Sequence, residues 1–239
     1  MRVRKAPRGR LLPHETAPLV RGRQEPRARS LRHETEPYVE RLLWSAGIAR
    51  VAGIDEVGMG PLAGPVVAAA VVFAADATPL RGIADSKLLP APARETAAAA
   101  IRAAALGIGL GVVEPEEIDR VNIYQAGLLA MRRAVRALPM APEHLIVDAR
   151  HIPDVDVPQM RYIRADAIVY SVAAASIVAK VHRDALMQEV DALYPAYGFA
   201  RHVGYATREH LQALAEYGPT PLHRRSFAPC AAAAARHAG

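Results

Sequence analysis

Short apolar runs alternate with helical segments along the chain, and this alternation predicts an α/β fold. Five runs are rich in apolar or β-branched residues and have the length of buried strands, at 50–57, 65–73, 106–114, 143–149 and 159–165. Helical periodicity and composition predict helices at 37–46, 91–105, 123–138, 167–193 and 206–218. Three strands come first and helices alternate with strands later, so we expect a layer sandwich around a mixed sheet.

Both ends of the chain are expected to lie outside one folded domain at 36–228. Residues 1–35 hold 10 Lys or Arg and 3 Glu, so the net charge of +6 is concentrated there. A Pro/Arg-rich segment of this kind cannot build a core and is expected to be disordered, as a solvated extension or as a basic arm for nucleic acid. An organellar transit peptide is the alternative, although Glu15 and Glu25 fit it poorly. Residues 229–239 are Ala-rich and are expected to be a frayed, low-complexity tail.

Cysteine usage and hydropathy indicate a cytoplasmic protein. Cys230 is the single cysteine, so the chain cannot form an internal disulfide and offers no thiolate metal cage. The sequence contains no run of about 18 apolar residues and no apolar signal core near its start. We therefore expect neither membrane insertion nor export.

Four acidic residues differ from the others because each ends or follows an apolar strand. These residues are Asp55, Glu56, Asp148 and Asp166. In open α/β sheets, reactive side chains collect at strand ends, so we expect the four carboxylates to converge. Taken singly, Asp166 could instead cap the following helix, and the others could form turns. Four such coincidences explain the pattern less well than one cluster.

Clustered carboxylates predict a site for divalent metal ions. They cannot all stay ionised together without cations, and oxygen ligands suit Mg²⁺ or Mn²⁺. Such a site typically binds a phosphate, where two ions activate a water and stabilise the leaving oxygen, so the residues predict phosphodiester hydrolysis. Neighbours on a regular strand point to opposite faces. Asp55 is therefore the better candidate ligand, whereas Glu56 contributes from the rim or through its carbonyl unless the strand already breaks there.

Several motifs in order resemble bacterial ribonuclease HII over about residues 50–228. They are "GIDEVGMGPLAGPVVAAAVV", "DSK", "IVDA", "ADAIVYSVAAASIVAKVHRD" and "YPAYGFARHVGYATREHLQALAEYGPTPLHRRSF". The resemblance implies an RNase H-like fold, with a central mixed five-stranded sheet flanked by helices and a C-terminal helical extension. It also implies an endonuclease that cuts the RNA strand of RNA/DNA hybrids and cuts 5′ of ribonucleotides embedded in duplex DNA. The products would carry 3′-hydroxyl and 5′-phosphate ends.

The resemblance also assigns roles to individual residues. It makes the four strand-end acids the catalytic metal ligands, binding two Mg²⁺ or Mn²⁺ ions when substrate is present. It gives recognition of the substrate's 2′-hydroxyl to the loop after the Asp-Glu pair and to the "HxGYxT" tyrosine, here Gly58, Met59, Gly60 and Tyr205. Four basic residues suit phosphate contacts, although solvated surface charge explains any of them alone: Lys87, Lys180, Arg224 and Arg225. Lys180 is the weakest of them, because Asp184 follows one helical turn later.

Two positions depart from the family pattern. Met59 replaces the usual arginine of the loop, and Ile168 replaces a common lysine. Hydrolysis should survive both changes, because neither touches the acids. We expect backbone contacts from Gly58 and Gly60 to retain 2′-hydroxyl recognition, with weaker phosphate binding.

The sequence leaves two other functions to consider. A resolvase-like nuclease would share the strand-end acids but lack "HxGYxT" and "HRRSF". A noncatalytic hybrid-binding module would not need all four acids. By analogy with the family, we expect a monomer.

Overall fold

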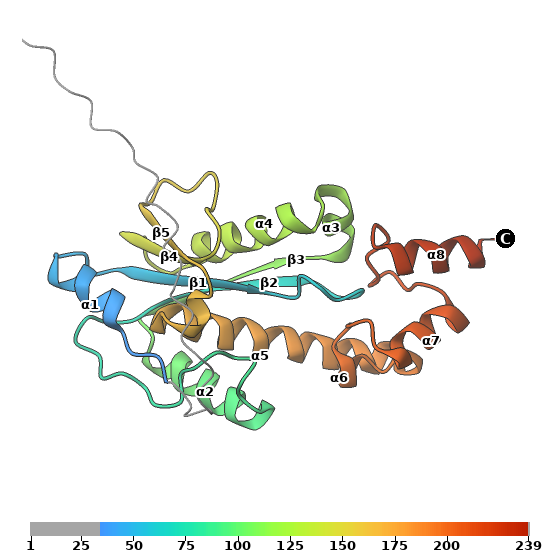
Figure 1. The fold of residues 1–239 in the computed structure, drawn as a ribbon, viewed down its shortest axis with the longest axis horizontal. Helices are drawn as coiled ribbons and strands as arrows, with labels where there is room; N and C mark the ends of the chain where they lie inside the picture. Colours follow the sequence, from blue (N-terminus) through green and yellow to red (C-terminus); the bar gives the residue numbers. More distant parts are fainter. Residues whose placement is uncertain (1–33, 239) are drawn as a thin grey trace, which may run out of the picture.

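A five-stranded mixed sheet forms the centre of the structure, a computed structural model that describes residues 34–238 (Figure 1). Its order is β3-β2-β1-β4-β5, with β1, β2 and β3 antiparallel and β1, β4 and β5 parallel. The strands are β1 (Val51–Val57), β2 (Val66–Val72), β3 (Gly107–Val113), β4 (His144–Asp148) and β5 (Gln159–Tyr162). The predicted mixed sheet is confirmed. The last strand ends early, because Ala165–Ala167 forms a 3-10 turn, η1.

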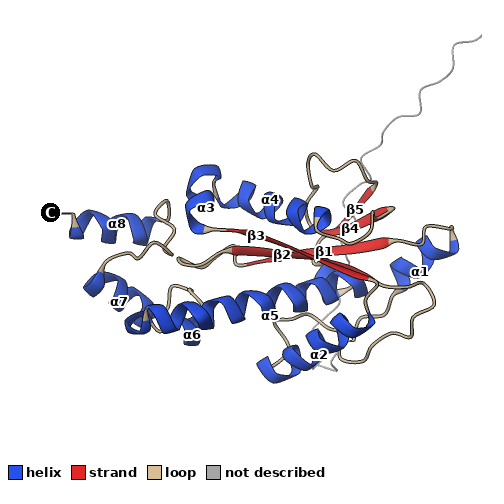
Figure 2. Cartoon of the chain, turned by 180° about the vertical axis from the view of Figure 1, so that it is seen from behind, coloured by secondary structure: helices blue, strands red, loops and turns tan. Residues whose placement is uncertain are grey.

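Helices cover both faces of the sheet (Figures 1 and 2). One face carries α4 with α3, and the other carries α5 with α2. The helices are α1 (Tyr38–Ser45), α2 (Ala91–Ala104), α3 (Pro115–Val121), α4 (Ile123–Arg136), α5 (Tyr170–Leu193), α6 (Phe199–His202), α7 (Arg208–Tyr217) and α8 (Ala228–His237), and a second 3-10 turn, η2, covers Pro195–Tyr197. The five predicted helices are present, whereas the short α3 and α6 escaped the periodicity analysis. Within residues 34–238, every helix is too short or too polar to cross a membrane.

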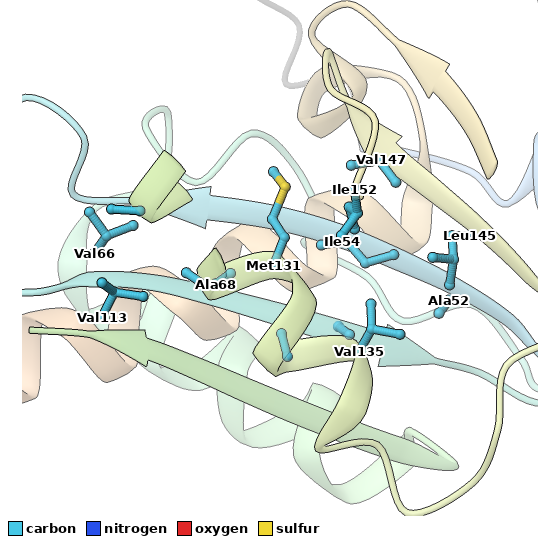
Figure 3. Packing of buried hydrophobic residues seen from close by; sticks show 14 of the residues in the cluster. Ala52, Ile54, Val66, Ala68, Val113, Met131, Val135, Leu145, Val147 and Ile152 are labelled. Carbon is cyan, nitrogen blue, oxygen red and sulfur yellow. The ribbon is translucent and has the colours of Figure 1, made fainter. Parts of the chain in front are cut away.

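Alternation along the strands separates two cores. On the α4 face, Met131 and Val135 pack with Ile54 of β1 and Leu145 of β4 (Figure 3). Residues of the opposite parity on β2, such as Val67, pack on α5 and α2. Consecutive strand residues point to opposite faces of the sheet. The same alternation therefore decides whether a side chain at the end of a strand faces α4 or α5.

The start of α5 lies against β1 because position 53 has no side chain. A Cβ atom on Gly53 would lie 2.2 Å from the carbonyl carbon of Ser171, in the first turn of α5. Glu40 of α1 is buried and fixes the same turn, since its Oε1 accepts hydrogen bonds from the Ser171 amide at 2.7 Å and the Ser171 hydroxyl at 2.5 Å. A residue 131 positions away thus caps the long helix in place of a local N-cap residue.

The C-terminal helices form an ordered extension, which corrects the prediction of a frayed tail at 229–239. Helix α8 covers Ala228–His237 and buries Cys230 and Ala233 against Leu62 and Leu214. The alanines that looked like low complexity are helix formers with one small-residue face against the rest of the fold. At the other end, Thr35 is buried and bonded to the Ile83 carbonyl, whereas the predicted disorder of the basic segment falls on residues 1–33, outside the described residues.

A chain of histidines joins the C-terminal segments. His223 Nδ1 accepts from the Thr220 amide at 3.0 Å, so its Nε2 carries the proton and faces His210 Nε2 at 3.0 Å. His210 Nδ1 in turn donates to the Tyr205 carbonyl at 2.8 Å. Both rings are therefore neutral in this network, and burial together with His210 lowers the pKa of His223 to about 4. The chain fixes the backbone of Tyr205.

Replacing Glu40 with alanine should lower the free energy of unfolding by about 2–3 kcal/mol, because it removes two hydrogen bonds to its carboxyl oxygen and leaves the buried Ser171 amide unpaired. Urea denaturation followed by circular dichroism measures this change. Glu36→Ala is the matched control, since Glu36 only forms a half-exposed pair with Arg41 at 3.8 Å. Equal effects of the two substitutions would refute the capping role of Glu40.

Stability should fall as the pH drops from about 6.5 to about 4. An unfolded histidine takes up a proton near pH 6.5, but His223 stays neutral in the folded state until its pKa of about 4. The folded state therefore loses roughly 3 kcal/mol relative to the unfolded state across this window. Unfolding free energies of wild type and His223→Gln between pH 7 and pH 4 test this, with the exposed His151→Gln as control. An unchanged slope in His223→Gln would contradict it.

Candidate active site

Three of the four predicted acids meet on the α5 face at one edge of the sheet. Asp55 lies near the end of β1, and Asp148 ends β4, which runs parallel to β1, so both side chains emerge at the same edge. Asp166 belongs to η1, directly before α5. Asp55 and Asp166 are each only 4% exposed. The Asp148 carboxylate accepts from the Ala165 amide at 2.7 Å, which ties β4 to the turn that carries Asp166.

Two carboxylates of the cluster, Asp55 and Asp148, resist ionisation. Burial raises the pKa of Asp55 well above its usual value, and the charge of Glu56 raises it further. A hydrogen bond with the Ser176 side chain opposes this rise, while Asp148 and Asp166 add to it. Burial also raises the pKa of Asp148. Such a group of acids binds protons or cations strongly, which is the electrostatic condition for a divalent-metal site.

Glu56 points to the opposite face of the sheet, as strand geometry predicts. Its carboxylate lies on the α4 side, where its Oε1 is 3.5 Å from an Nη atom of Arg150. Burial raises the pKa of Glu56 to about 7, although Arg150 opposes the rise. Its Oε2 is buried without a hydrogen-bond partner among the described residues. The Glu56 carboxylate therefore lies on the other face of the sheet from the three aspartates.

The acids supply the oxygen ligands that a hard cation prefers, but their carboxylates do not converge closely enough to hold an ion in this structure. Within residues 34–238, no three His, Cys, Asp or Glu side chains stand together in a geometry that could hold a metal ion. Lys87 donates instead to Asp166 at 2.8 Å, and Arg150 faces Glu56. The donor set itself fits Mg²⁺ or Mn²⁺, because it consists only of carboxylate oxygens and leaves a buried oxygen of Glu56 unsatisfied.

Two buried arginines hold the glycine loop that follows β1. The guanidinium of Arg224 donates to the carbonyls of Gly58 at 2.6 Å, Met59 at 3.3 Å and Gly64 at 2.8 Å. Arg183 of α5 donates to the carbonyls of Pro65 and other residues around the loop. Gly58 has φ +88°, and a Cβ atom there would lie 2.4 Å from Arg183 Nε. Glycine is therefore required at position 58 both by backbone conformation and by space.

This arrangement corrects the expectation for Arg224. The side chain is fully buried, and its Nε and both Nη atoms bond to loop carbonyls, so it cannot also contact a phosphate. From the sequence, Arg224 was expected to lie on the surface, as charged residues usually do. The partners that allow its burial lie about 160 residues earlier in the chain, where no local pattern reveals them.

The other predicted loop residues lie close together. A Cβ atom on Gly60 would be 3.6 Å from the ring of Tyr205, which is 47% exposed. The Leu62 amide donates to the Gly204 carbonyl at 2.8 Å, which joins the tyrosine segment to the loop. Met59 turns away from Tyr205 and packs on the α4 core. The structure thus brings Gly60 and Tyr205 together and directs the Met59 side chain elsewhere.

The remaining basic candidates have different surroundings. Lys87 borders the acids while its side chain is 75% exposed. Lys180 donates to Asp184 at 2.6 Å, which confirms the helical pairing that weakened its candidacy. Arg225 is exposed, and its backbone amide is held by Asp119 at 2.8 Å. Ile168 is 52% exposed beside the acid-bearing turn.

Sequence reasoning missed two residues that shape the site, Ser176 and Arg150. Ser176 of α5 lowers the pKa of Asp55, and its hydroxyl oxygen lies 2.9 Å from that of Ser86. Arg150 faces Glu56 and was not noticed, although its position two residues after Asp148 at a strand end was a usable signal. Ser176 gave no such signal, because a serine within an alanine-rich helix usually only packs.

Comparison with known proteins agrees with these features. A family model described as Ribonuclease HII matches residues 52–230. Relatives named ribonuclease HII from Geobacillus kaustophilus and Geobacillus thermodenitrificans are 56% and 57% identical over 190 residues, which make up 80% of this chain and 72% and 73% of the relatives. The crystal structure of ribonuclease H2 from Pyrococcus horikoshii superimposes with a TM-score of 0.68 at 26% identity, covering 78% of this chain and 98% of that one. The chain therefore belongs to the ribonuclease HII family and is an endoribonuclease of the RNase H class.

Proposed function

We propose that the chain is a metal-dependent endonuclease that cuts the RNA strand of RNA/DNA hybrids and cuts 5′ of ribonucleotides embedded in duplex DNA. The ends left would be a 3′-hydroxyl and a 5′-phosphate. The observation that carries this proposal is that strand-end carboxylates and a rigidly held glycine loop meet at one edge of the sheet. The carboxylates suit hydrolysis of a phosphodiester, and the loop suits recognition of the sugar beside it.

Asp55, Glu56, Asp148 and Asp166 would hold Mg²⁺ or Mn²⁺, two ions when substrate is bound. Such ions activate a water and stabilise the leaving oxygen of an in-line displacement. The raised pKa values of Asp55, Glu56 and Asp148 support this role, because they report carboxylates that lack enough positive charge. Ser176 would keep the Asp55 carboxylate oriented through its hydrogen bond.

Recognition of the 2′-hydroxyl is proposed for Gly58, Met59, Gly60 and Tyr205. The carbonyls of Gly58 and Met59 are occupied by Arg224, while the amides of Met59 and Gly60 find no partner among residues 34–238. Free backbone amides are suitable donors to a hydroxyl oxygen, which is the group that separates RNA from DNA. Tyr205 is exposed beside Gly60, where its ring could pack on the neighbouring sugar.

Lys87 and Arg225 are the proposed phosphate contacts, since both side chains are exposed. Lys180 is a weaker candidate because Asp184 already binds its ammonium group. The substrates would be RNA/DNA hybrids and ribonucleotide-containing duplex DNA. We further propose a monomer that works in the cytoplasm, consistent with a chain whose one cysteine is buried and free.

A duplex DNA with a single ribonucleotide tests the proposed function. The protein should nick it 5′ of the ribonucleotide with Mg²⁺ or Mn²⁺ and not with EDTA. Asp55→Asn and Asp148→Asn should each slow nicking by at least about a thousandfold, about 4 kcal/mol of barrier, because each removes a charged ligand. Asp156→Asn, an exposed acid on the loop before β5, serves as control. Nicking without metal, or undiminished nicking by either variant, would reject the mechanism.

Metal affinity should weaken as the pH falls from 8 to 6. Glu56 has a pKa of about 7 and the pKa of Asp55 is also raised, so protons compete with the ion in this range. For each carboxyl that must lose a proton to bind the ion, the apparent metal affinity falls by up to about tenfold per pH unit below the pKa of that carboxyl. Calorimetric titration with Mn²⁺ in buffers of different ionisation enthalpy would count the released protons. An affinity that stays constant from pH 8 to pH 6 would contradict the expectation.

A further inference from the structure

The Arg150 side chain lies in a cradle on the α4 face, next to Glu56. Its guanidinium carbon is 5.0 Å from the centre of the Tyr124 ring. A Cβ atom on Gly127, one turn further along α4, would lie 2.6 Å from Arg150 Nη1 and 3.1 Å from the Met59 sulfur. Glycine inside a helix costs about 1 kcal/mol relative to alanine. Here its missing side chain leaves the space that the guanidinium occupies.

A tight turn aims Arg150 into this cradle. The Arg150 amide donates to the Asp148 carbonyl at 2.6 Å, and Ala149 between them has φ +52°. Residues other than glycine rarely adopt this conformation, because it is strained. The turn sends Asp148 toward the acids on the α5 face while Arg150 reaches the opposite face. The strained conformation of Ala149 thus fixes the directions of both the Asp148 carboxylate and the Arg150 guanidinium.

The guanidinium is held in place but its hydrogen bonds are incomplete. Nη1 is buried without a partner among the described residues, and the contact to Glu56 at 3.5 Å is longer than a normal hydrogen bond. Leaving a buried donor unpaired costs about 1–3 kcal/mol. The whole Arg150 side chain is 21% exposed, so it lies at the border between the α4 face and solvent. An arginine that is oriented by an aromatic ring and lacks partners is well suited to an incoming anion.

We propose that Arg150 is a substrate-contacting residue that binds a backbone phosphate of the nucleic acid beside Glu56. This inference rests on the proposed function. The planar guanidinium presents parallel donors that match phosphate oxygens, and the Tyr124 ring fixes its plane. Met59, which packs on the same cradle, brings no charge to this side of the loop. Arg150 therefore supplies the cation there, and the weaker phosphate binding expected from Met59 should not occur.

Binding measurements test the role of Arg150. In the hydrolysis-deficient Asp55→Asn background with Mg²⁺, fluorescence anisotropy gives the Kd for a labelled duplex with one ribonucleotide at several salt concentrations. Adding Arg150→Met should raise Kd about tenfold at low salt and reduce the slope of log Kd against log salt by about one, as expected for one lost phosphate contact. Arg132→Met is the matched control, because Arg132 also lies on this face but pairs with Asp154.

Gly127→Ala provides a second variant that keeps the charge. Its methyl group would displace the guanidinium, so Kd should rise in the same direction while the helix keeps its stability. The Gly127→Ala/Arg150→Met double variant should bind no more weakly than Arg150→Met alone, since both changes remove one contact. Additive losses would overturn the proposal.

Nicking assays with wild type and the single Arg150→Met variant distinguish a lost phosphate contact from a lack of the proposed activity. If wild type nicks the duplex but Arg150→Met leaves Kd, KM and the salt slope unchanged, the phosphate contact is rejected. If Arg150→Met lowers kcat alone, Arg150 acts only through Glu56, and the contact is equally rejected. Failure of wild type to nick would instead reject the proposed function, whatever the binding assay shows.

Discussion

Two buried arginines, Arg183 and Arg224, organise the structure by collecting the backbone carbonyls of the loop after β1. A buried guanidinium is costly, and burial lowers the pKa of Arg224 to about 9. The cost is offset because carbonyl oxygens of the loop surround its donors. One arginine comes from α5 and the other from the segment between α7 and α8. The loop therefore depends on one helix and one connecting segment that follow it by more than a hundred residues.

This constraint links the acidic residues to the loop and tyrosine for which we propose substrate recognition. The loop begins directly after the strand that carries Asp55 and Glu56, so its position relative to the carboxylates is set by the same arginines. Tyr205 is fixed by the histidine chain through its carbonyl. The acidic edge of the sheet and the C-terminal helices consequently form one structural unit.

Much of this arrangement could be predicted from the sequence, for identifiable reasons. The strands were visible because burial imposes local apolar runs, and Asp55 and Asp148 were visible because an acid at the end of such a run is unusual. The opposed directions of Asp55 and Glu56 followed from strand geometry. Burial of Arg224, in contrast, depends on partners about 160 residues away, and the order of α8 depends on a docking face that composition does not reveal. Arg150 was missed because its partners on α4 are distant in sequence.

Gly53 also acts as a spacer for the acids. Asp55 lies two residues later on the same face of β1, and Asp166 lies just before the helix whose first turn presses on Gly53. The width of the gap between these carboxylates is therefore set by contact between two backbones, with a hydrogen atom as the only side chain between them. Any larger residue at position 53 would push α5 away from β1 and so move Asp166 away from Asp55, although both acids would be unchanged. The spacing of Asp55 and Asp166 thus depends on the smallest residue near them.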